Sequence, residues 1–159
     1  LKAPRVAVLI GGTSKAYTMT PQIMANLCAQ LKSIDAGLMI TASRRTGKDY
    51  TLTLHDAFTN TDAYIWNGEG ENPYLGMLAW ADIILVTADS ASMLSDACTT
   101  GKPVYMISLD GGAKRIDKLH ANLRQSGALR IFDGNLEHWA YEPLNDAAII
   151  AENIRKRLK

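Results

Sequence analysis

The chain alternates between short apolar runs and longer segments in which apolar residues recur every three or four positions. A short continuous apolar run predicts a strand buried on both faces of a sheet, whereas the longer period predicts an amphipathic helix. The predicted strands lie at residues 5–10, 37–41, 63–66, 83–87, 104–107 and 129–132. Strands that alternate with helices in this way are typical of a parallel sheet covered by helices on both faces.

Capping signals place several of the helices between these strands. Thr20 followed by Pro21 predicts the start of the first helix, because Thr is a good N-cap and Pro fits the first helical position. Asn72 and Pro73 predict the start of another helix. This second helix carries three apolar residues, Leu75, Leu78 and Ala79. Further helices are predicted over residues 49–58, 92–100, 117–126 and 143–158.

Right-handed crossovers leave few arrangements for this alternation, and the commonest has the strand order 3-2-1-4-5-6. We therefore predict a Rossmann-like three-layer α/β/α sandwich with a mainly parallel sheet. The 159 residues, 47% of them hydrophobic, suffice for one such domain over residues 1–159. In this order the first and fourth strands are neighbours, and their carboxyl ends flank the crevice where open α/β sheets bind ligands.

Charge and missing motifs exclude several classes of function. The 17 basic and 16 acidic residues leave a net charge of +1, so nothing favours a nucleic-acid partner or an anionic membrane surface. Cys28 and Cys98 lack the spacing of metal ligands, and no apolar stretch approaches the roughly 20 residues of a membrane-spanning helix. We expect reduced thiols, no metal site, no transmembrane segment and a cytoplasmic location. Neither GxGxxG nor GxxxxGK[ST] occurs, so no cofactor is predicted.

Two turns rich in small residues follow the first and fourth predicted strands. The first is Gly11-Gly12-Thr13-Ser14 and the second is Asp89-Ser90-Ala91-Ser92. Both offer backbone N–H groups and hydroxyls without bulky side chains, which suits a phosphorylated ligand. A plain tight turn and simple helix capping are the alternatives. A carboxylate beside a phosphate is unfavourable, so Asp89 is assigned to capping or to polar contacts with a substrate.

One helical turn beyond Ser92, Asp96 lies on the same face of the predicted helix. Its carboxylate is placed to accept hydrogen bonds from both hydroxyls of a ribose. Such charge-assisted bonds contribute about 1.5–3 kcal/mol each when they are sheltered from water. An exposed surface aspartate is the alternative interpretation.

Three segments together resemble the donor-binding half of GT-B glycosyltransferases, and especially the peptidoglycan N-acetylglucosaminyltransferase. They are residues 78–86, residues 90–97 and residues 101–104. In that group an acidic residue of the serine-bearing helix binds the nucleotide ribose, and Asp96 stands at this position, where glutamate is usual. The resemblance implies that the chain is the C-terminal half of a GT-B fold.

A closer resemblance covers nearly the whole chain. The segments 8–15, 41–46, 70–74 and 86–90 are similar to the ELM-type "mitochondrial fission" family, most of whose members are bacterial. Its members are about twice this length, with a preceding domain that this chain lacks, and are sometimes labelled nucleoside-diphosphate-sugar epimerases. Leu1 in place of a starting methionine likewise predicts a domain of a longer protein.

The family motif adds two loops to the candidate site. Ser43 and Arg44 follow the second strand, where paired arginines can clamp a diphosphate or form a surface basic pair. Asn67 and Gly68 follow the third strand, in a loop that can wrap a nucleobase or serve as a long exposed turn. His120 is expected at the surface or against the donor sugar.

These observations predict a domain that binds a nucleotide-diphosphate sugar, within a longer glycosyltransferase-like protein whose missing N-terminal domain completes the cleft. A sugar-nucleotide epimerase and a non-catalytic scaffold are the alternatives. No catalytic residue is assigned, and this domain by itself is expected to bind rather than catalyse. The predicted binding residues are Gly11, Gly12, Thr13, Ser14, Ser43, Arg44, Asn67, Gly68, Asp89, Ser90, Ser92, Met93, Asp96 and Lys114.

Overall fold

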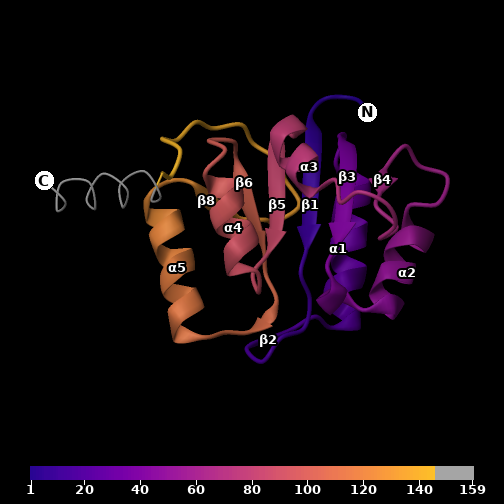
Figure 1. Ribbon diagram of the computed structural model, residues 1–159, viewed down its shortest axis with the longest axis horizontal. Coiled ribbons are helices and arrows are strands. Elements are labelled where there is room, and N and C mark those ends of the chain that lie inside the picture. Colours follow the sequence, from indigo (N-terminus) through magenta and orange to yellow (C-terminus); the bar gives the residue numbers. More distant parts are fainter. Residues whose placement is uncertain (146–159) are drawn as a thin grey trace, which may run out of the picture.

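The computed structural model describes residues 1–145 and consists of a six-stranded parallel sheet with helices packed against it (Figure 1). The strands of the sheet are β1 (Arg5–Ile10), β3 (Gly37–Ala42), β4 (Tyr64–Ile65), β5 (Ile83–Thr87), β6 (Val104–Ile107) and β8 (Leu129–Ile131). Their order is β4-β3-β1-β5-β6-β8, and every neighbouring pair is parallel. The predicted fold class and the strand order 3-2-1-4-5-6 are thereby confirmed.

The helices connect these strands. They are α1 (Pro21–Ser33), the short 3₁₀ turn η1 (Arg44–Thr46), α2 (Lys48–Ala57), α3 (Tyr74–Trp80), α4 (Ala91–Cys98) and α5 (Lys114–Gln125). Helix α1 packs against α2, and α4 packs against α5. Right-handed crossovers place α1 and α2 on one face of the sheet and α3, α4 and α5 on the other. The predicted helix over 143–158 lies almost entirely outside the described residues.

The core lies at β1 and β5, the two central strands (Figure 1). Residues 6–10 of β1 are all 0% exposed. Strands buried on both faces are uniformly apolar, which is why the sequence reveals them as continuous runs. Because β1 and β5 are adjacent, the loops at their carboxyl ends meet.

The helix starts follow the predicted caps in part. The Thr20 hydroxyl accepts a hydrogen bond from the Ile23 N–H at 3.2 Å, as an N-cap does. The Asn72 side chain accepts from the Tyr74 N–H at 3.0 Å, but α3 then buries Met77 and Leu78. The predicted helix over 117–126 begins three residues early, at Lys114, without a side-chain cap.

A small antiparallel pair of strands was not predicted. Strand β2 (Tyr17–Thr18) pairs with β7 (Asp110–Gly111) and so ties the loop after β1 to the loop after β6. A Cβ on Gly111 would lie 2.2 Å from the Ala16 carbonyl oxygen, so the pairing requires glycine there. Two-residue strands carry no periodic signal, and sequence patterns therefore miss them.

Both cysteines are buried and unpaired, and burial raises the pKa of the Cys98 thiol to about 12. In residues 1–145 no helix has the length and apolar composition needed to cross a membrane. Over the same residues, no group of three or more His, Cys, Asp or Glu side chains is placed to hold a metal ion.

An ion pair between Arg5 and Asp82 joins the start of β1 to the start of β5. The Arg5 backbone N–H donates to Asp82 Oδ2 at 2.7 Å, and Arg5 Nη2 donates to Oδ1 at 2.8 Å. These hydrogen bonds lower the pKa of Asp82 from 3.8 to about 2. A carboxylate whose pKa is depressed on folding stabilises the folded state above its unfolded pKa, and this contribution disappears as the pH falls through the folded value.

We expect Asp82→Asn to lower the free energy of unfolding by about 1 kcal/mol at pH 7, less than the pKa shift alone implies, because solvent screens a partly exposed pair. The difference from wild type should shrink between about pH 5 and about pH 2, where the wild-type carboxylate gains its proton. Urea denaturation of both proteins at several pH values measures this difference. A difference that stayed constant down to pH 2 would contradict the assignment.

Candidate functional site

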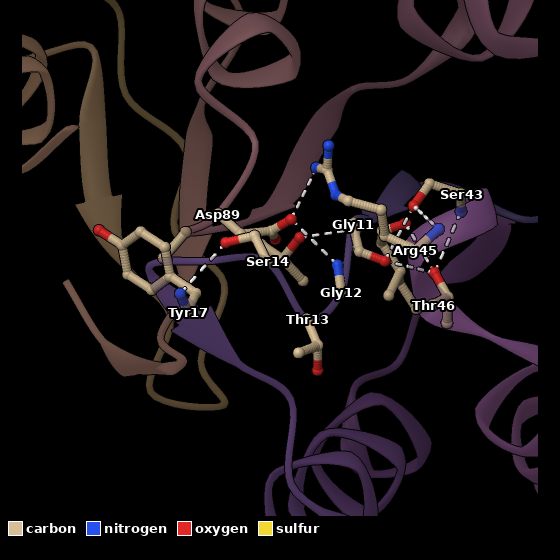
Figure 2. A network of polar contacts seen from close by, with 12 residues as sticks. Gly11, Gly12, Thr13, Ser14, Tyr17, Ser43, Arg45, Thr46 and Asp89 are labelled. Atoms are coloured by element: carbon tan, nitrogen blue, oxygen red, sulfur yellow. Dashed lines mark hydrogen bonds and ion pairs between the residues drawn. The ribbon is translucent and has the colours of Figure 1, made fainter. Parts of the chain in front are cut away.

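The two turns that follow β1 and β5 lie side by side at the carboxyl edge of the sheet (Figure 2). The Gly12 N–H donates to Asp89 Oδ2 at 3.0 Å, although 77 residues separate the two in sequence. The Gly11 N–H donates to the Thr87 hydroxyl at 2.7 Å. The predicted meeting of the two turns is therefore present, but a carboxylate of the protein lies between them.

We call the place where the turns after β1 and β5 meet the corner, and Asp89 is its central residue. Its side chain is 0% exposed, and its Oδ2 also accepts from Nη2 of Arg45 at 2.7 Å (Figure 2). Its Oδ1 is buried without a hydrogen-bond partner among the residues that the structure describes. A buried acceptor left unpaired costs about 1–3 kcal/mol, so this arrangement is under energetic strain.

Of the two roles expected for Asp89, helix capping is wrong, and polar contact with a substrate stays a prediction. The N-cap of α4 is Ser90, whose side chain makes no capping bond. The carboxylate instead reaches across to the turn after β1, because two glycines leave room for it there. It occupies the Gly12 N–H, one of the donors that we expected a phosphate to use.

The glycine pair is explained by close approaches within the protein. A Cβ on Gly11 would lie 2.3 Å from Asp89 Oδ2, and a Cβ on Gly12 would lie 2.3 Å from the Arg45 carbonyl oxygen. No side chain fits at either position without moving the buried Asp89 carboxylate or the backbone of Arg45. Both glycines are thus required by the corner itself, whether or not a ligand binds.

The hydroxyls of Thr13 and Ser14 fold the loop after β1. Thr13 Oγ1 accepts from the Met19 N–H at 3.1 Å, and Ser14 Oγ accepts from the Tyr17 N–H at 3.1 Å. Each hydroxyl keeps its own proton to donate. Their hydrogen bonds therefore stabilise the loop and leave one donor each for a ligand.

The turn after β3 fastens that strand to β1. The Ser43 hydroxyl donates to the Gly11 carbonyl oxygen at 3.0 Å, and the Thr46 hydroxyl donates to the Ile10 carbonyl oxygen at 3.1 Å. Ser43 also caps the 3₁₀ turn η1 with a capping box. This cap sets the start of η1 and therefore the positions of Arg44 and Arg45 in that turn.

A groove of about 600 Å³ lies on the β3 and β4 side of this corner. It brings together five of the predicted binding residues, Ser43, Arg44, Asn67, Gly68 and Met93. The rest of its lining consists of Ile10, Thr41, Ala42, Thr51, Trp66, Asn72 and Tyr74. The lining is therefore apolar and aromatic, with amide and hydroxyl groups and a single guanidinium.

Sequence reasoning missed Trp66 and Tyr74 as members of the site. Trp66 directly follows β4, and its indole N–H donates to the Glu69 carbonyl oxygen at 2.9 Å, which shapes the loop. The Asn67 side chain accepts from the Glu69 N–H at 3.0 Å. A Trp at the carboxyl end of a predicted strand was the available signal, because that edge carries the ligand site in this class of sheet.

Asp96 stands beside the groove rather than in its lining. The Tyr74 hydroxyl, which lines the groove, donates to Asp96 Oδ2 at 2.9 Å. Burial and this bond raise the pKa of Tyr74. Asp96 is exposed and lines a separate hollow, together with Thr99 of the α4 end and Leu119 of α5.

The remaining predicted residues are spread over the carboxyl edge. Ser90 is buried at the start of α4, and Ser92 is exposed in its first turn. Lys114 is exposed at the start of α5 and lies outside the lining of the groove. The groove therefore gathers the residues that follow β3 and β4 but not those that follow β6.

The expectation that His120 lies at the surface or against a sugar is wrong. Only 7% of it is exposed, and its Nε2 lies 3.0 Å from the Ala88 carbonyl oxygen. Burial lowers the pKa of His120. This contact joins α5 to the loop after β5. Because charged residues surround His120 in the sequence, no local pattern indicates that it is buried.

The fold and the groove define an α/β protein with a doubly wound parallel sheet and a hollow at the carboxyl edge of that sheet, beside the point between β1 and β5 where the winding reverses. The comparison with protein families specifies the class further. The chain belongs to the family described as Mitochondrial fission ELM1, whose family model matches residues 1–158. This confirms the resemblance seen in the sequence.

Two relatives match almost the whole chain. The chain is 39% identical to the mitochondrial fission protein ELM1 of Arabidopsis thaliana over 99% of its length. It is 32% identical to the uncharacterized protein RP120 of Rickettsia prowazekii over 96% of its length. The alignments cover only 39% and 46% of these relatives, so the chain spans less than half of their length.

Solved structures resemble the chain less closely. The crystal structure of an FMN-dependent cysteine decarboxylase, SpaF, matches with a TM-score of 0.48 and 14% identity over 96% of this chain and 97% of that one.

Proposed function

We propose that this chain is the donor-binding part of a longer GT-B-type, glycosyltransferase-like protein, and that it holds a nucleotide-diphosphate sugar in the groove beside β3 and β4. The observation that carries the proposal is the groove itself. It lies at the carboxyl edge of the sheet beside β3 and β4, next to the winding reversal between β1 and β5, has a volume of about 600 Å³ and combines an aromatic wall with amide groups and one arginine. A cavity of this size and composition suits a ligand with a flat base and an anionic tail.

The parts of the ligand are assigned by the chemistry of the lining. The base would lie against Trp66, with hydrogen bonds from the loop of Asn67 and Gly68. The ribose would lie over Tyr74, within reach of Asp96. The diphosphate would lie toward Arg44, whose planar guanidinium binds phosphate oxygens in pairs.

The contact between Asp89 and the Gly12 N–H supports a first diphosphate contact at Arg44, beside the glycine turn. We expected Gly12, Thr13, Ser14, Ser90 and Ser92 to hold the phosphates, but Asp89 occupies the Gly12 N–H. Arg44 therefore takes the main role in this proposal, and the remaining donors and Lys114 lie at its periphery. Fixed donors of this kind would stabilise the negative charge that develops on the leaving diphosphate during sugar transfer.

Two alternatives receive different support. Among the described residues, the groove lining contains no carboxylate or imidazole, so an epimerase would lack these common acid/base groups there. A non-catalytic scaffold is favoured by the position of Asp89, because a family member that no longer binds phosphate can fill the glycine turn with its own carboxylate. Ligand titration separates the scaffold from both enzymes.

Calorimetric titration with uridine and guanosine diphosphate sugars tests the proposal. We expect binding to one of them at millimolar concentration or below, and we expect Asp96→Ala to weaken it about tenfold if the ribose contact contributes about 1.5 kcal/mol. Asp56→Ala, an exposed change on α2, is the matched control and should leave the affinity unchanged. Absence of binding to every nucleotide tested would remove both enzyme proposals for this part of the protein.

A further inference from the structure

The corner between β1, β3 and β5 has the composition of an anion site whose anion is a side chain of the protein. Its two donors are the Gly12 N–H and the Arg45 guanidinium, and both are aimed at one oxygen, Asp89 Oδ2. A backbone N–H beside a guanidinium is a common way to hold a phosphate oxygen. The carboxylate thus stands where the oxygen of a phosphate would stand.

We propose that the Gly12 N–H and the Arg45 guanidinium form a phosphate site, which the Asp89 carboxylate occupies and yields when a phosphate of the ligand binds. The exchange makes and breaks hydrogen bonds only. The two donors leave Asp89 Oδ2 and bind a phosphate oxygen, and the Asp89 side chain rotates out of the corner to water, because a buried carboxylate without partners is strongly unfavourable. Asp89 is then an internal competitor that lowers the affinity of the site for anions.

The first support is the imperfect fit of the carboxylate. Its side chain is completely buried, yet Oδ1 has no hydrogen-bond partner in the described part of the chain. A carboxylate that served only to fasten the sheet edge would be expected to have both oxygens paired, as Asp82 has with Arg5. The unpaired oxygen makes the occupied state less stable and so favours its release.

The second support is the access to Arg45. The Arg45 side chain is 49% exposed, whereas the Asp89 side chain is not exposed at all. Arg45 also follows Arg44 in the same short turn, and Arg44 lines the groove. An anion that enters the groove beside Arg44 therefore meets Arg45 from the solvent side and competes with Asp89 for it.

Asp89→Asn tests the exchange directly. An asparagine keeps the size of the side chain and an acceptor for the Gly12 N–H but removes the charge that holds Arg45. The probe is inorganic pyrophosphate at low salt, because screening weakens such contacts. We expect Asp89→Asn to bind pyrophosphate at least ten times more tightly than wild type by calorimetry, and the double variant Asp89→Asn/Arg45→Met to lose this gain.

The wild-type protein provides a second measurement that does not depend on a variant. On titration with pyrophosphate, the NMR signals of the Gly12 amide and the Arg45 Nε–H are expected to shift together. Two results would overturn the proposal. One is that Asp89→Asn binds pyrophosphate no more tightly than wild type does. The other is that the Gly12 and Arg45 signals of the wild type do not shift up to about 10 mM pyrophosphate, which is near the weakest affinities worth measuring. Asp89 would then be a permanent part of the sheet edge.

The proposal deepens the function assigned to the groove and can fail separately from it. If nucleotide-diphosphate sugars bind but the Gly12 and Arg45 signals do not respond, the donor-binding proposal stands and the exchange is wrong. If pyrophosphate moves both signals but no nucleotide sugar binds, the phosphate site is real and the donor-binding proposal fails. Uridine without phosphates, as a control, should leave both signals in place.

Discussion

An alanine at position 11 is expected to lower the free energy of unfolding by about 3 kcal/mol or more, because its Cβ has no room. That atom would lie 2.3 Å from Asp89 Oδ2 and 2.4 Å from Oδ1. The carboxylate cannot retreat without giving up the Gly12 N–H and Arg45, its two hydrogen-bond donors. Urea denaturation followed by circular dichroism measures the loss.

The matched control is Gly76→Ala. Gly76 lies in α3 with nothing within 4 Å of an added Cβ, so alanine there should stabilise the protein by up to about 1 kcal/mol through helix propensity. Gly11→Ala should also be less destabilising when Asp89 is replaced by alanine in the same chain, because the two changes affect one space. Equal stability of Gly11→Ala and Gly76→Ala would show that Asp89 does not lie against Gly11.

Arg45→Met is the second change for which we expect a large effect. It keeps most of the aliphatic stem but leaves the completely buried Asp89 carboxylate without its only cationic partner in the described structure. We expect a loss of about 2–3 kcal/mol, below the range for fully buried pairs because half of the Arg45 side chain is in contact with water.

Arg44→Met provides the comparison for this loss. Arg44 is exposed in the same turn, and substitutions of exposed residues usually change stability by less than about 0.5 kcal/mol. Chemical denaturation of both variants at pH 7 gives the two values. If the two arginines proved interchangeable in stability, the Arg45–Asp89 pair would have no structural role.

The sequence predicts the sheet and helices of this protein well, because periodic patterns of apolar residues mark these elements. Strands β1, β5 and β6 begin and end at the predicted residues, and the strand order follows from the handedness of crossovers. The short strands β2 and β7 have no such signal. Their pairing depends on a contact between residues 17 and 111, which no local pattern reveals.

The candidate site was predicted less completely, for a different physical reason. A sequence shows that Asp89 and the glycine pair reach the same edge, but it does not show which way a carboxylate points. The direction depends on Arg45, for which the sequence predicts, together with Arg44, a diphosphate clamp or a surface basic pair. Likewise, α3 exposes Leu75 and buries Met77, because seven residues of almost uniformly apolar sequence do not specify which face turns inward.

The central place of β1 also affects how the chain folds as it is made. Strand β1 pairs with β3 on one side and with β5 on the other, and the register joins Val6 to Ile83. At ribosomal rates of about 5–20 residues per second, β5 emerges about 4–15 s after β1. Throughout that interval one edge of β1, which is apolar over residues 6–10, has no partner, and such an edge readily pairs with other chains. The strand order that places the groove beside β3 and β4 thus also makes the nascent chain prone to aggregation until residue 87 has been synthesised.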